Sequence, residues 1–180
     1  MVILKTANTI KKMREAGRLS ALALKVGGEA VIPGATTADI DKAIYDFIVS
    51  QGATPSFLNL YGFPASACIS VNDELIHGIP GNRVIKEGDI VSIDVGACLD
   101  GYHGDNAATF VAGEASEEAQ KLLDVTKQSL YKGIEMAVVG NRVGDISNAV
   151  QTYCEERGYS VVREFVGHGI GRAVHEDPEV

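Results

Sequence analysis

The stretch "GATTADIDKAIYDFIVSQG", residues 34–52, has the pattern of an amphipathic helix enclosed by two glycines. Its apolar residues recur at the i, i+3, i+4, i+7 and i+8 positions of one helical face, at Ile40, Ala43, Ile44, Phe47 and Ile48. Thr36 and Asp39 have the spacing of a capping box, and Gly52 is typical of a helix end. The stretch therefore predicts a helix that buries one face in a core.

The same pattern returns 106 residues later, in "GNRVGDISNAVQTYCEERG", residues 140–158. Glycines again enclose the stretch, an aspartate holds the same place, and the apolar face is repeated at Ile146, Ala149, Val150, Tyr153 and Cys154. A His-x-x-Pro motif follows each stretch, with His77 in the first and His175 in the second. Because this period is too long for a solenoid repeat, we expect two similar halves of one domain.

We expect this domain to span residues 1–180, with a first half of about 1–112 and an incomplete second half of about 113–180. The expected fold class is α/β (α+β), with a pseudo-two-fold axis between the halves. A functional site between them would be natural, since pockets favour such interfaces.

Composition excludes several classes of protein. Hydrophobic residues make up 46% and charged residues 22% of the chain, as in an ordinary globular protein. The formal charge is -8 and no basic run is longer than two lysines, so nucleic acid is not an expected partner. Charged residues interrupt every apolar run, which argues against a signal peptide or membrane span and makes the cytoplasm the expected location. The three cysteines lack the spacing of a disulfide framework or a zinc knuckle.

Two aspartates lie on a predicted β-hairpin. The segment "SIDVGACLDGYHGDNA" reads as two strands joined by a turn at Asp100-Gly101, which sets Asp105 opposite Gly96. Asp94 and Asp105 then project from one face, close enough to share a cation. Because Asp94 interrupts an apolar strand, its carboxylate needs a partner.

Each aspartate alone is more simply interpreted as a strand-end residue that binds backbone amides or an arginine. The pair, together with His168 between two glycines, favours a metal site instead. Carboxylates with one imidazole suit manganese, iron(II) or cobalt, and aspartates that bridge ions indicate a two-metal hydrolytic centre. His77 and His175 have equivalent places in the two halves, so we expect both to flank the cleft and contact a substrate carbonyl or oxyanion. His103 has no such counterpart and is expected to be a surface residue.

Three motifs now point to a known family. In order, "SVNDELIHGIP", "IVSIDVGACLDGYHGDNA" and "EFVGHGIGRAVHEDP" resemble those of bacterial type I methionine aminopeptidases, and the opening "IKKMREAGRLSALAL" resembles that family's first helix. The resemblance covers essentially all 180 residues. It implies the pita-bread α/β fold shared with creatinase and prolidase.

The resemblance also implies an activity, the removal of the initiator methionine from nascent proteins by a hydroxide that bridges two divalent ions, which would be cobalt, manganese, iron or zinc. By the same resemblance, Asp94, Asp105 and His168 match metal ligands, and His77 and His175 match histidines that contact substrate. Phe63 and Cys68 resemble part of the methionine side-chain pocket. A transient association with the ribosome is expected for an enzyme that acts on nascent chains.

The sequence departs from the family pattern at its C-terminal end. Two glutamate ligands of the family lie beyond the matching region, and neither Glu176 nor Glu179 falls in their motif. We therefore expect a C-terminally truncated chain that binds metals weakly and hydrolyses a Met-Ala-Ser peptide feebly or not at all. Two alternatives stay open: a non-catalytic protein of the creatinase fold that binds peptides or a protein partner, and another aminopeptidase of the same fold, such as a proline-specific one.

Overall fold

The computed structural model describes all 180 residues, and the chain forms two compact units. The first, here called the sheet unit, comprises Val2–Ala115 and Ile170–Glu176. The second, the helical unit, comprises Met1, Ser116–Gly169 and Asp177–Val180. No helix in the structure combines the length and the apolar character needed to cross a bilayer.

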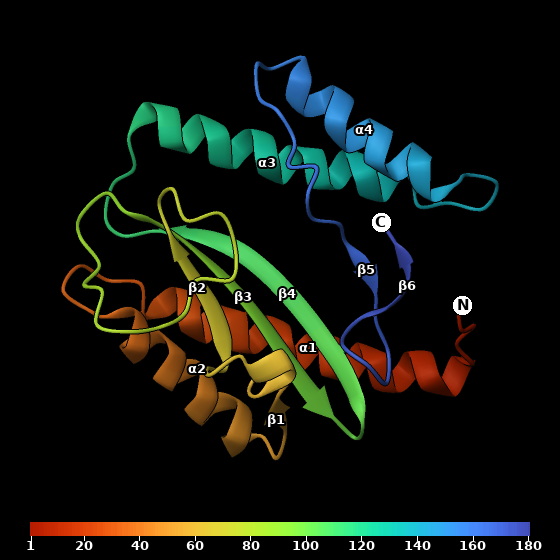
Figure 1. Cartoon of the computed structure of the whole chain (residues 1–180), viewed down its shortest axis with the longest axis horizontal. Helices are drawn as coiled ribbons and strands as arrows, with labels where there is room; N and C mark the ends of the chain where they lie inside the picture. The colour runs from red at the N-terminus through yellow and green to blue at the C-terminus, as the bar shows by residue number, and fades with distance from the viewer. The chain divides into compact units, whose positions relative to one another are not determined.

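An antiparallel sheet with β3 at its centre is the frame of the sheet unit (Figure 1). All three other strands pair antiparallel with β3. Strand β4 pairs with the whole length of β3, β2 with its N-terminal half and β1 with its C-terminal end. The elements of this unit are α1 (Ala7–Glu29), α2 (Thr37–Ser50), β1 (Thr54–Pro55), a 3-10 turn η1 (Leu60–Gly62), β2 (Ala67–Val71), β3 (Ile90–Leu99) and β4 (Tyr102–Val111).

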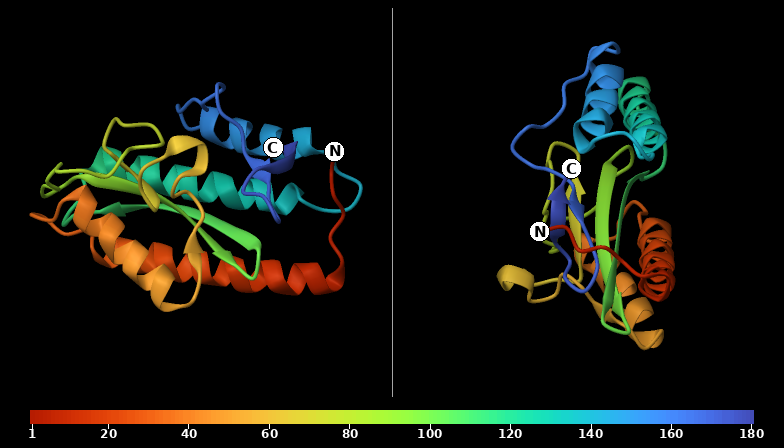
Figure 2. Two further views of the ribbon diagram at one scale, coloured as in Figure 1. Left: turned by 60° about the horizontal axis from the view of Figure 1, so that its bottom comes forward. Right: turned by 90° about the vertical axis from the view of Figure 1, so that its right-hand side faces the viewer.

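Helices α1 and α2 cover one face of this sheet, as the right-hand view of Figure 2 shows. Beneath them, Val91, Ile93 and Val95 of β3 are completely buried, as is the isoleucine stripe of α2. Gly27 lets α1 approach α2 closely, because a Cβ at Gly27 would lie 2.7 Å from the Cδ1 atom of Ile44 in α2. The core of the sheet unit therefore lies on one side of β3.

Helix α2 has the bounds and the cap that its sequence predicts. The Thr36 hydroxyl accepts a hydrogen bond from the Asp39 amide at 3.1 Å, and the Asp39 carboxylate accepts one from the Thr36 amide at 2.8 Å. Ile40, Ile44 and Ile48 are all fully buried. The amphipathic interpretation of residues 34–52 is confirmed.

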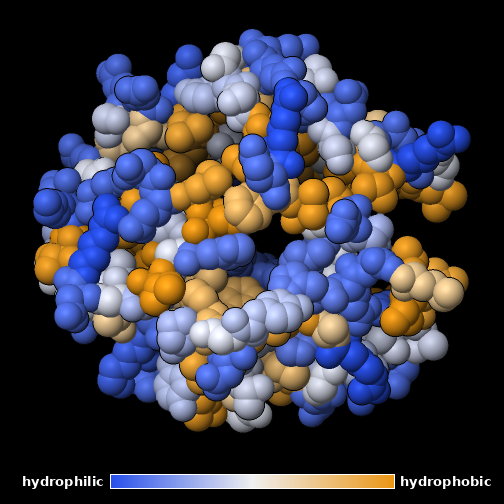
Figure 3. All heavy atoms as spheres, in the orientation of Figure 1, coloured by the Kyte–Doolittle hydropathy of each residue, from blue (hydrophilic) through white to orange (hydrophobic).

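The helical unit contains α3 (Glu117–Met136) and α4 (Val143–Glu155), which pack on each other. It also contains the two-stranded sheet of β5 (His168–Gly169) and β6 (Glu176–Glu179), except for Glu176, which belongs to the sheet unit. At the helix contact, a Cβ on Gly133 would lie 2.9 Å from the Cγ2 atom of Val150. Large apolar side chains stay exposed on this unit, for example Leu130 at 58% and Ile134 at 55%. Figure 3 shows such hydrophobic side chains interspersed with polar ones on the face viewed in Figure 1.

The two predicted helices repeat each other in backbone conformation. Gly34 and Gly140, before the helices, have φ of +96° and +101°, and Gly52 and Gly158, after them, have φ of +73° and +82°. These are left-handed conformations that glycine adopts without steric cost. The internal repeat inferred from the sequence is thus present in the local structure of both units.

Candidate metal and substrate site

The two aspartates of the β3–β4 hairpin come together as the sequence predicts. Gly96 pairs with Asp105 and Asp94 pairs with Ala107, so the predicted register is confirmed. Since alternate residues of a strand share a face, both carboxylates project from the face of β3 opposite the helices. A hydrogen bond joins the Asp94 and Asp105 side chains, which requires a proton on one of them.

This arrangement has an electrostatic cost that identifies it as a candidate cation site. Burial, followed by the charge of Asp105 and the hydrogen bond to it, raises the pKa of Asp94 to about 8. Two neighbouring carboxylates cannot both ionise without a positive charge near them, so a proton or a metal ion must neutralise the pair. No group of three or more histidine, cysteine, aspartate or glutamate side chains is gathered in the structure to hold a metal. The aspartate pair is therefore the part of the predicted ligand set that the structure assembles.

A small apolar cluster lies beside the carboxylates. Its buried members are Phe57, Cys68 and Val174, with the partly buried Leu60 and Phe63 packed against them. Cys68 pairs directly with Asp94 across β2 and β3. Burial, reinforced by the charges of Asp94, Asp105 and Asp41, raises the pKa of the Cys68 thiol to about 12. This apolar cluster thus places a neutral thiol and aromatic rings next to the carboxylate pair.

Phe63 and Cys68, which the sequence predicts as part of a methionine side-chain pocket, both belong to the apolar cluster, whereas the sequence did not predict Phe57 and Val174. Their places in the sequence could have indicated them, because Phe57 precedes the same loop as Phe63 and Val174 directly precedes His175. Their roles depend on loops that fold back onto β3, which periodicity alone does not reveal.

Helix α2 fixes the start of β2 and with it the position of Cys68. One carboxylate oxygen of Asp41 accepts hydrogen bonds from the Ser66 and Ala67 amides, each at 2.9 Å. Burial raises the pKa of Asp41, and these two amides partly offset that effect. The carboxylate therefore joins the helix to the strand immediately before the apolar cluster.

His77 lies in a strained turn against β2. Its φ is +58°, a left-handed conformation that is uncommon for a residue with a side chain. Next to it, Gly78 accepts a hydrogen bond from the Ile69 amide at 2.9 Å, and a Cβ at Gly78 would come within 2.2 Å of the Ile69 carbonyl oxygen. The turn is thus held closely against the strand, and retained backbone strain of this kind is common at functional sites.

His175 lies in the segment Ile170–Glu176, which belongs to the sheet unit. Its ring stacks on Tyr61 of η1, with centroids 5.9 Å apart and an interplanar angle of 25°. Val174, the preceding residue, is buried in the apolar cluster. The segment therefore brings His175 next to the loop that supplies Phe57 and Phe63.

The prediction that His103 is a surface residue is wrong. His103 is the second residue of β4 and is half-buried, with its Nδ1 atom 2.8 Å from the Ser56 hydroxyl. Burial lowers the pKa of the imidazole, although a hydrogen bond to the Arg172 backbone acts in the opposite direction. The segment that buries this histidine is distant in sequence, which is why the residue appeared exposed.

His168 belongs to the helical unit, at the start of β5. Its Nδ1 atom lies 2.9 Å from the carbonyl oxygen of Gly169. The assignment of His168 as a third metal ligand rests on its Gly-His-Gly motif.

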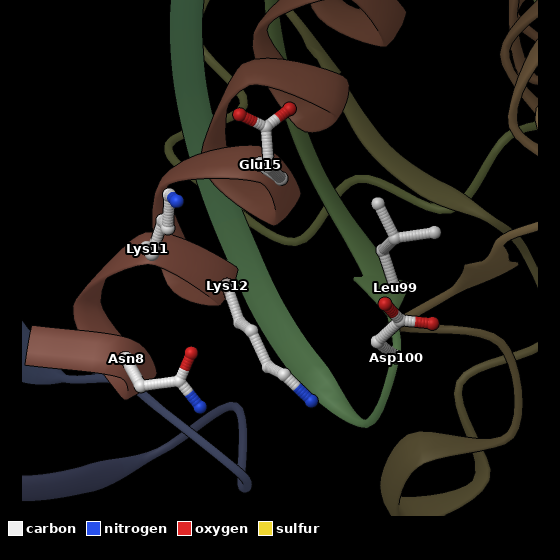
Figure 4. Close-up of a pocket in the computed structure, with 6 residues that line it drawn as sticks. All are labelled: Asn8, Lys11, Lys12, Glu15, Leu99 and Asp100. Atoms are coloured by element: carbon white, nitrogen blue, oxygen red, sulfur yellow. The ribbon is translucent and has the colours of Figure 1, made fainter. Parts of the chain in front are cut away.

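A separate pocket of about 210 Å³ lies between the N-terminal turns of α1 and the β3–β4 turn (Figure 4). Its lining residues are Asn8, Lys11, Lys12, Glu15, Leu99 and Asp100. None of the predicted site residues is among them. The chemistry of the carboxylate pair and the apolar cluster therefore lies elsewhere.

Comparison with known proteins identifies the family. The model of metallopeptidase family M24 matches residues 11–180 of this chain. The methionine aminopeptidase of Clostridium perfringens is 58% identical over 180 residues, which are 100% of this chain and 72% of that protein. The chain belongs to metallopeptidase family M24. Within this family, methionine aminopeptidase 1 of Bacillus subtilis is 52% identical over 100% of the chain and 73% of that protein.

A solved structure of the same family agrees with the fold. The crystal structure of methionine aminopeptidase from Rickettsia prowazekii is 41% identical and superposes with a TM-score of 0.97, covering 99% of this chain and 72% of that one. This likeness confirms the predicted α/β pita-bread class and the resemblance to methionine aminopeptidases within family M24.

Proposed function

We propose that this chain is a metal-dependent aminopeptidase specific for the N-terminal methionine of peptides and nascent proteins, with the feeble turnover of its own that the sequence predicts. The observation that carries the proposal is the hydrogen-bonded pair Asp94 and Asp105 beside a buried apolar cluster, in a chain 58% identical to a methionine aminopeptidase. A polar reaction centre next to an apolar cluster suits a substrate with an amide bond beside a thioether side chain.

We propose that Asp94, Asp105 and His168 hold divalent metal, two ions in all, of cobalt, manganese, iron or zinc. The carboxylate pair fits this role because a cation would replace the proton that now neutralises it. Oxygen ligands with one imidazole are also a suitable set for these metals. When bound, the metals would polarise the substrate carbonyl and lower the pKa of a water molecule.

We propose that the apolar cluster receives the methionine side chain. Phe57, Phe63 and Val174 offer apolar surface, and the thiol of Cys68 stays uncharged because its pKa is about 12. Sulfur and aromatic rings make favourable contacts, which suits a thioether.

His77 and His175 would contact the scissile amide and its carbonyl as hydrogen-bond partners. Nascent chains as substrates would locate the activity in the cytoplasm, with transient ribosome contact.

The metal assignment is tested by calorimetric titration of the chain with Mn²⁺ and Co²⁺. We expect Asp105→Asn to lower the affinity at least about tenfold, because a carboxylate ligand loses its charge. Asp100→Asn is the matched control: it removes one carboxylate from the turn of the same hairpin, where φ is +52° and asparagine is tolerated. Equal affinities for the two variants would contradict a metal site at Asp105.

The substrate assignment has its own measurement. Peptides with N-terminal methionine, leucine or lysine are titrated into the metal-loaded chain, and the affinity of each is measured by calorimetry. We expect the methionine peptide to bind more tightly than the lysine peptide, because the apolar cluster would have to desolvate the lysine charge. Stronger binding of the lysine peptide would contradict the proposed role of the cluster.

A further inference from the structure

The segment Ile170–Glu176, which belongs to the sheet unit, is hydrogen-bonded to β4 at His103. The His103 amide donates a hydrogen bond to the Gly171 carbonyl at 2.8 Å, so main chain joins main chain at this point. The His103 imidazole also bonds the backbone of Arg172. Its Nδ1 atom lies 2.8 Å from the Ser56 hydroxyl. One imidazole thus links two loops that are far apart in the sequence.

These two loops form the two sides of the apolar cluster. Ser56 directly precedes Phe57, and Arg172 lies two residues before Val174 and three before His175. A rigid ring that binds both loops fixes the separation between Phe57 and Val174. The same link restricts the position of His175, because only Ala173 and Val174 separate it from Arg172.

An ion pair holds the same segment at its other end. The Glu176 carboxylate accepts hydrogen bonds from the Arg172 amide at 2.8 Å and from the Ala173 amide at 3.2 Å. Its second oxygen pairs with the Lys5 ammonium, and the two side chains are only 20% and 11% exposed. A Cβ on Gly171 would lie 2.5 Å from the Glu176 carboxylate, so the carboxylate lies directly against the main chain of the loop there. The carboxylate therefore closes the segment into a tight loop around His175.

We propose that His103 and the Lys5–Glu176 pair are positioning residues, which hold Val174 within the apolar cluster that receives the methionine side chain and His175 beside that cluster. This inference rests on the proposed function for what the pocket binds. His103 acts through the loops on either side of it and does not itself contact the substrate. Its effect is on the affinity for the methionine side chain and on the environment of the His175 ring.

The first test uses His103→Phe, which keeps a ring but removes both side-chain hydrogen bonds, and Ser56→Ala, which removes one partner and leaves His103 in place. L-Methionine is the probe, titrated into the Mn²⁺-loaded chain. One buried hydrogen bond holds the loop by a factor of about ten in its equilibrium, so we expect up to about a tenfold loss of affinity for Ser56→Ala and a larger loss for His103→Phe. His103→Gln, which can bond one of the two partners, should partly restore the affinity.

A spectroscopic measurement separates positioning from general destabilisation. The chain has four histidines, so ring resonances labelled with ¹³C can be assigned by single substitutions. We expect His103→Phe and Lys5→Met to shift the His175 ring resonance while the Mn²⁺ affinity changes less than about twofold. Lys42→Met is the matched control, because Lys42 also pairs with a carboxylate, Asp46, but on the exposed surface of α2.

The outcomes distinguish the two levels of the proposal. If L-methionine fails to bind the unmodified chain but His103→Phe still shifts the His175 resonance, the substrate assignment is wrong and the positioning role stands. If L-methionine binds, and His103→Phe and Ser56→Ala change neither its affinity nor the His175 resonance, the positioning role is wrong.

Discussion

The two faces of the sheet around β3 are built from adjacent residues and have opposite properties. On the helix-covered face, Val91, Ile93 and Val95 are fully buried under α1 and α2. On the other face, Ser92 hydrogen-bonds Thr109 at 2.8 Å and Asp94 bonds Asp105. Since successive residues of a strand point to opposite faces, each step along β3 alternates between the two environments.

This difference separates what stabilises the fold from what the site requires. The apolar residues contribute free energy through burial, whereas the carboxylate pair lowers stability until a cation or a proton neutralises it. Two strands that are anchored by burial on one face of the sheet can therefore hold a pair of carboxyl groups on the other face. The helix-covered face provides the stability that the site face lacks.

The largest effect is expected from the helix-covered face. Ile93→Ala should lower the free energy of unfolding by about 3–4 kcal/mol, because the side chain is fully buried and packs near Gly27 of α1. Ser92→Ala, one residue away, should cost about 1 kcal/mol for its hydrogen bond to Thr109. Urea unfolding of both variants measures the difference. Equal losses would mean that the two faces contribute alike.

In the absence of metal, substitution of Asp94 is expected to raise the free energy of unfolding, whereas substitution of Ile93 lowers it. Its pKa is raised in the folded state, so its contribution to stability is complete below about pH 4, the unfolded value, and is lost as the pH rises to about 8. Asp94→Asn removes this loss. We expect the variant to be more stable than the parent chain at pH 8, by on the order of 2 kcal/mol, and to have a flatter dependence of stability on pH.

With bound metal, the parent chain should be more stable than Asp94→Asn. An ion that binds only the folded state stabilises it by RT ln(1 + [L]/Kd), so the parent chain should gain more from Mn²⁺ than Asp94→Asn does. Thermal unfolding at pH 8, with and without Mn²⁺, gives both comparisons. A variant less stable than the parent chain without metal would show that the Asp94 carboxylate has a stabilising partner instead.

Much of this contrast could be predicted from the sequence, because it depends on local rules. The two-residue turn at Asp100-Gly101 fixes the register, and the register places Asp94 and Asp105 on one face. The capping box and the glycine at the end of α2 similarly predict its bounds. The equivalent helix α4 keeps the aspartate bond, from the Arg142 amide to Asp145 at 2.7 Å. Arginine has no acceptor atom, however, so the second half of the box is lost there.

The parts that could not be predicted depend on contacts between distant segments. His103 was expected to be exposed because nothing near it in sequence covers it, yet the segment Ile170–Glu176 bonds both its amide and its ring. Phe57 and Val174 join the apolar cluster for the same reason. Periodicity identifies which face of a strand is buried, but it does not identify which loop returns to cover the other face.

The effect most specific to the site face concerns the reactivity of Cys68 and leaves the stability of the fold unchanged. With a pKa of about 12 instead of 9.0, its thiolate fraction at pH 8 is on the order of 10³-fold lower than that of an ordinary thiol. Iodoacetamide should therefore leave Cys68 unmodified in the folded chain and label it fully in urea, as peptide mass spectrometry would detect. The half-buried Cys98, farther along β3, serves as the internal reference. Labelling of Cys68 as fast as that of Cys98 would mean that the apolar cluster opens readily to solvent, and a cluster that opens so readily would not be a preformed pocket for a methionine side chain.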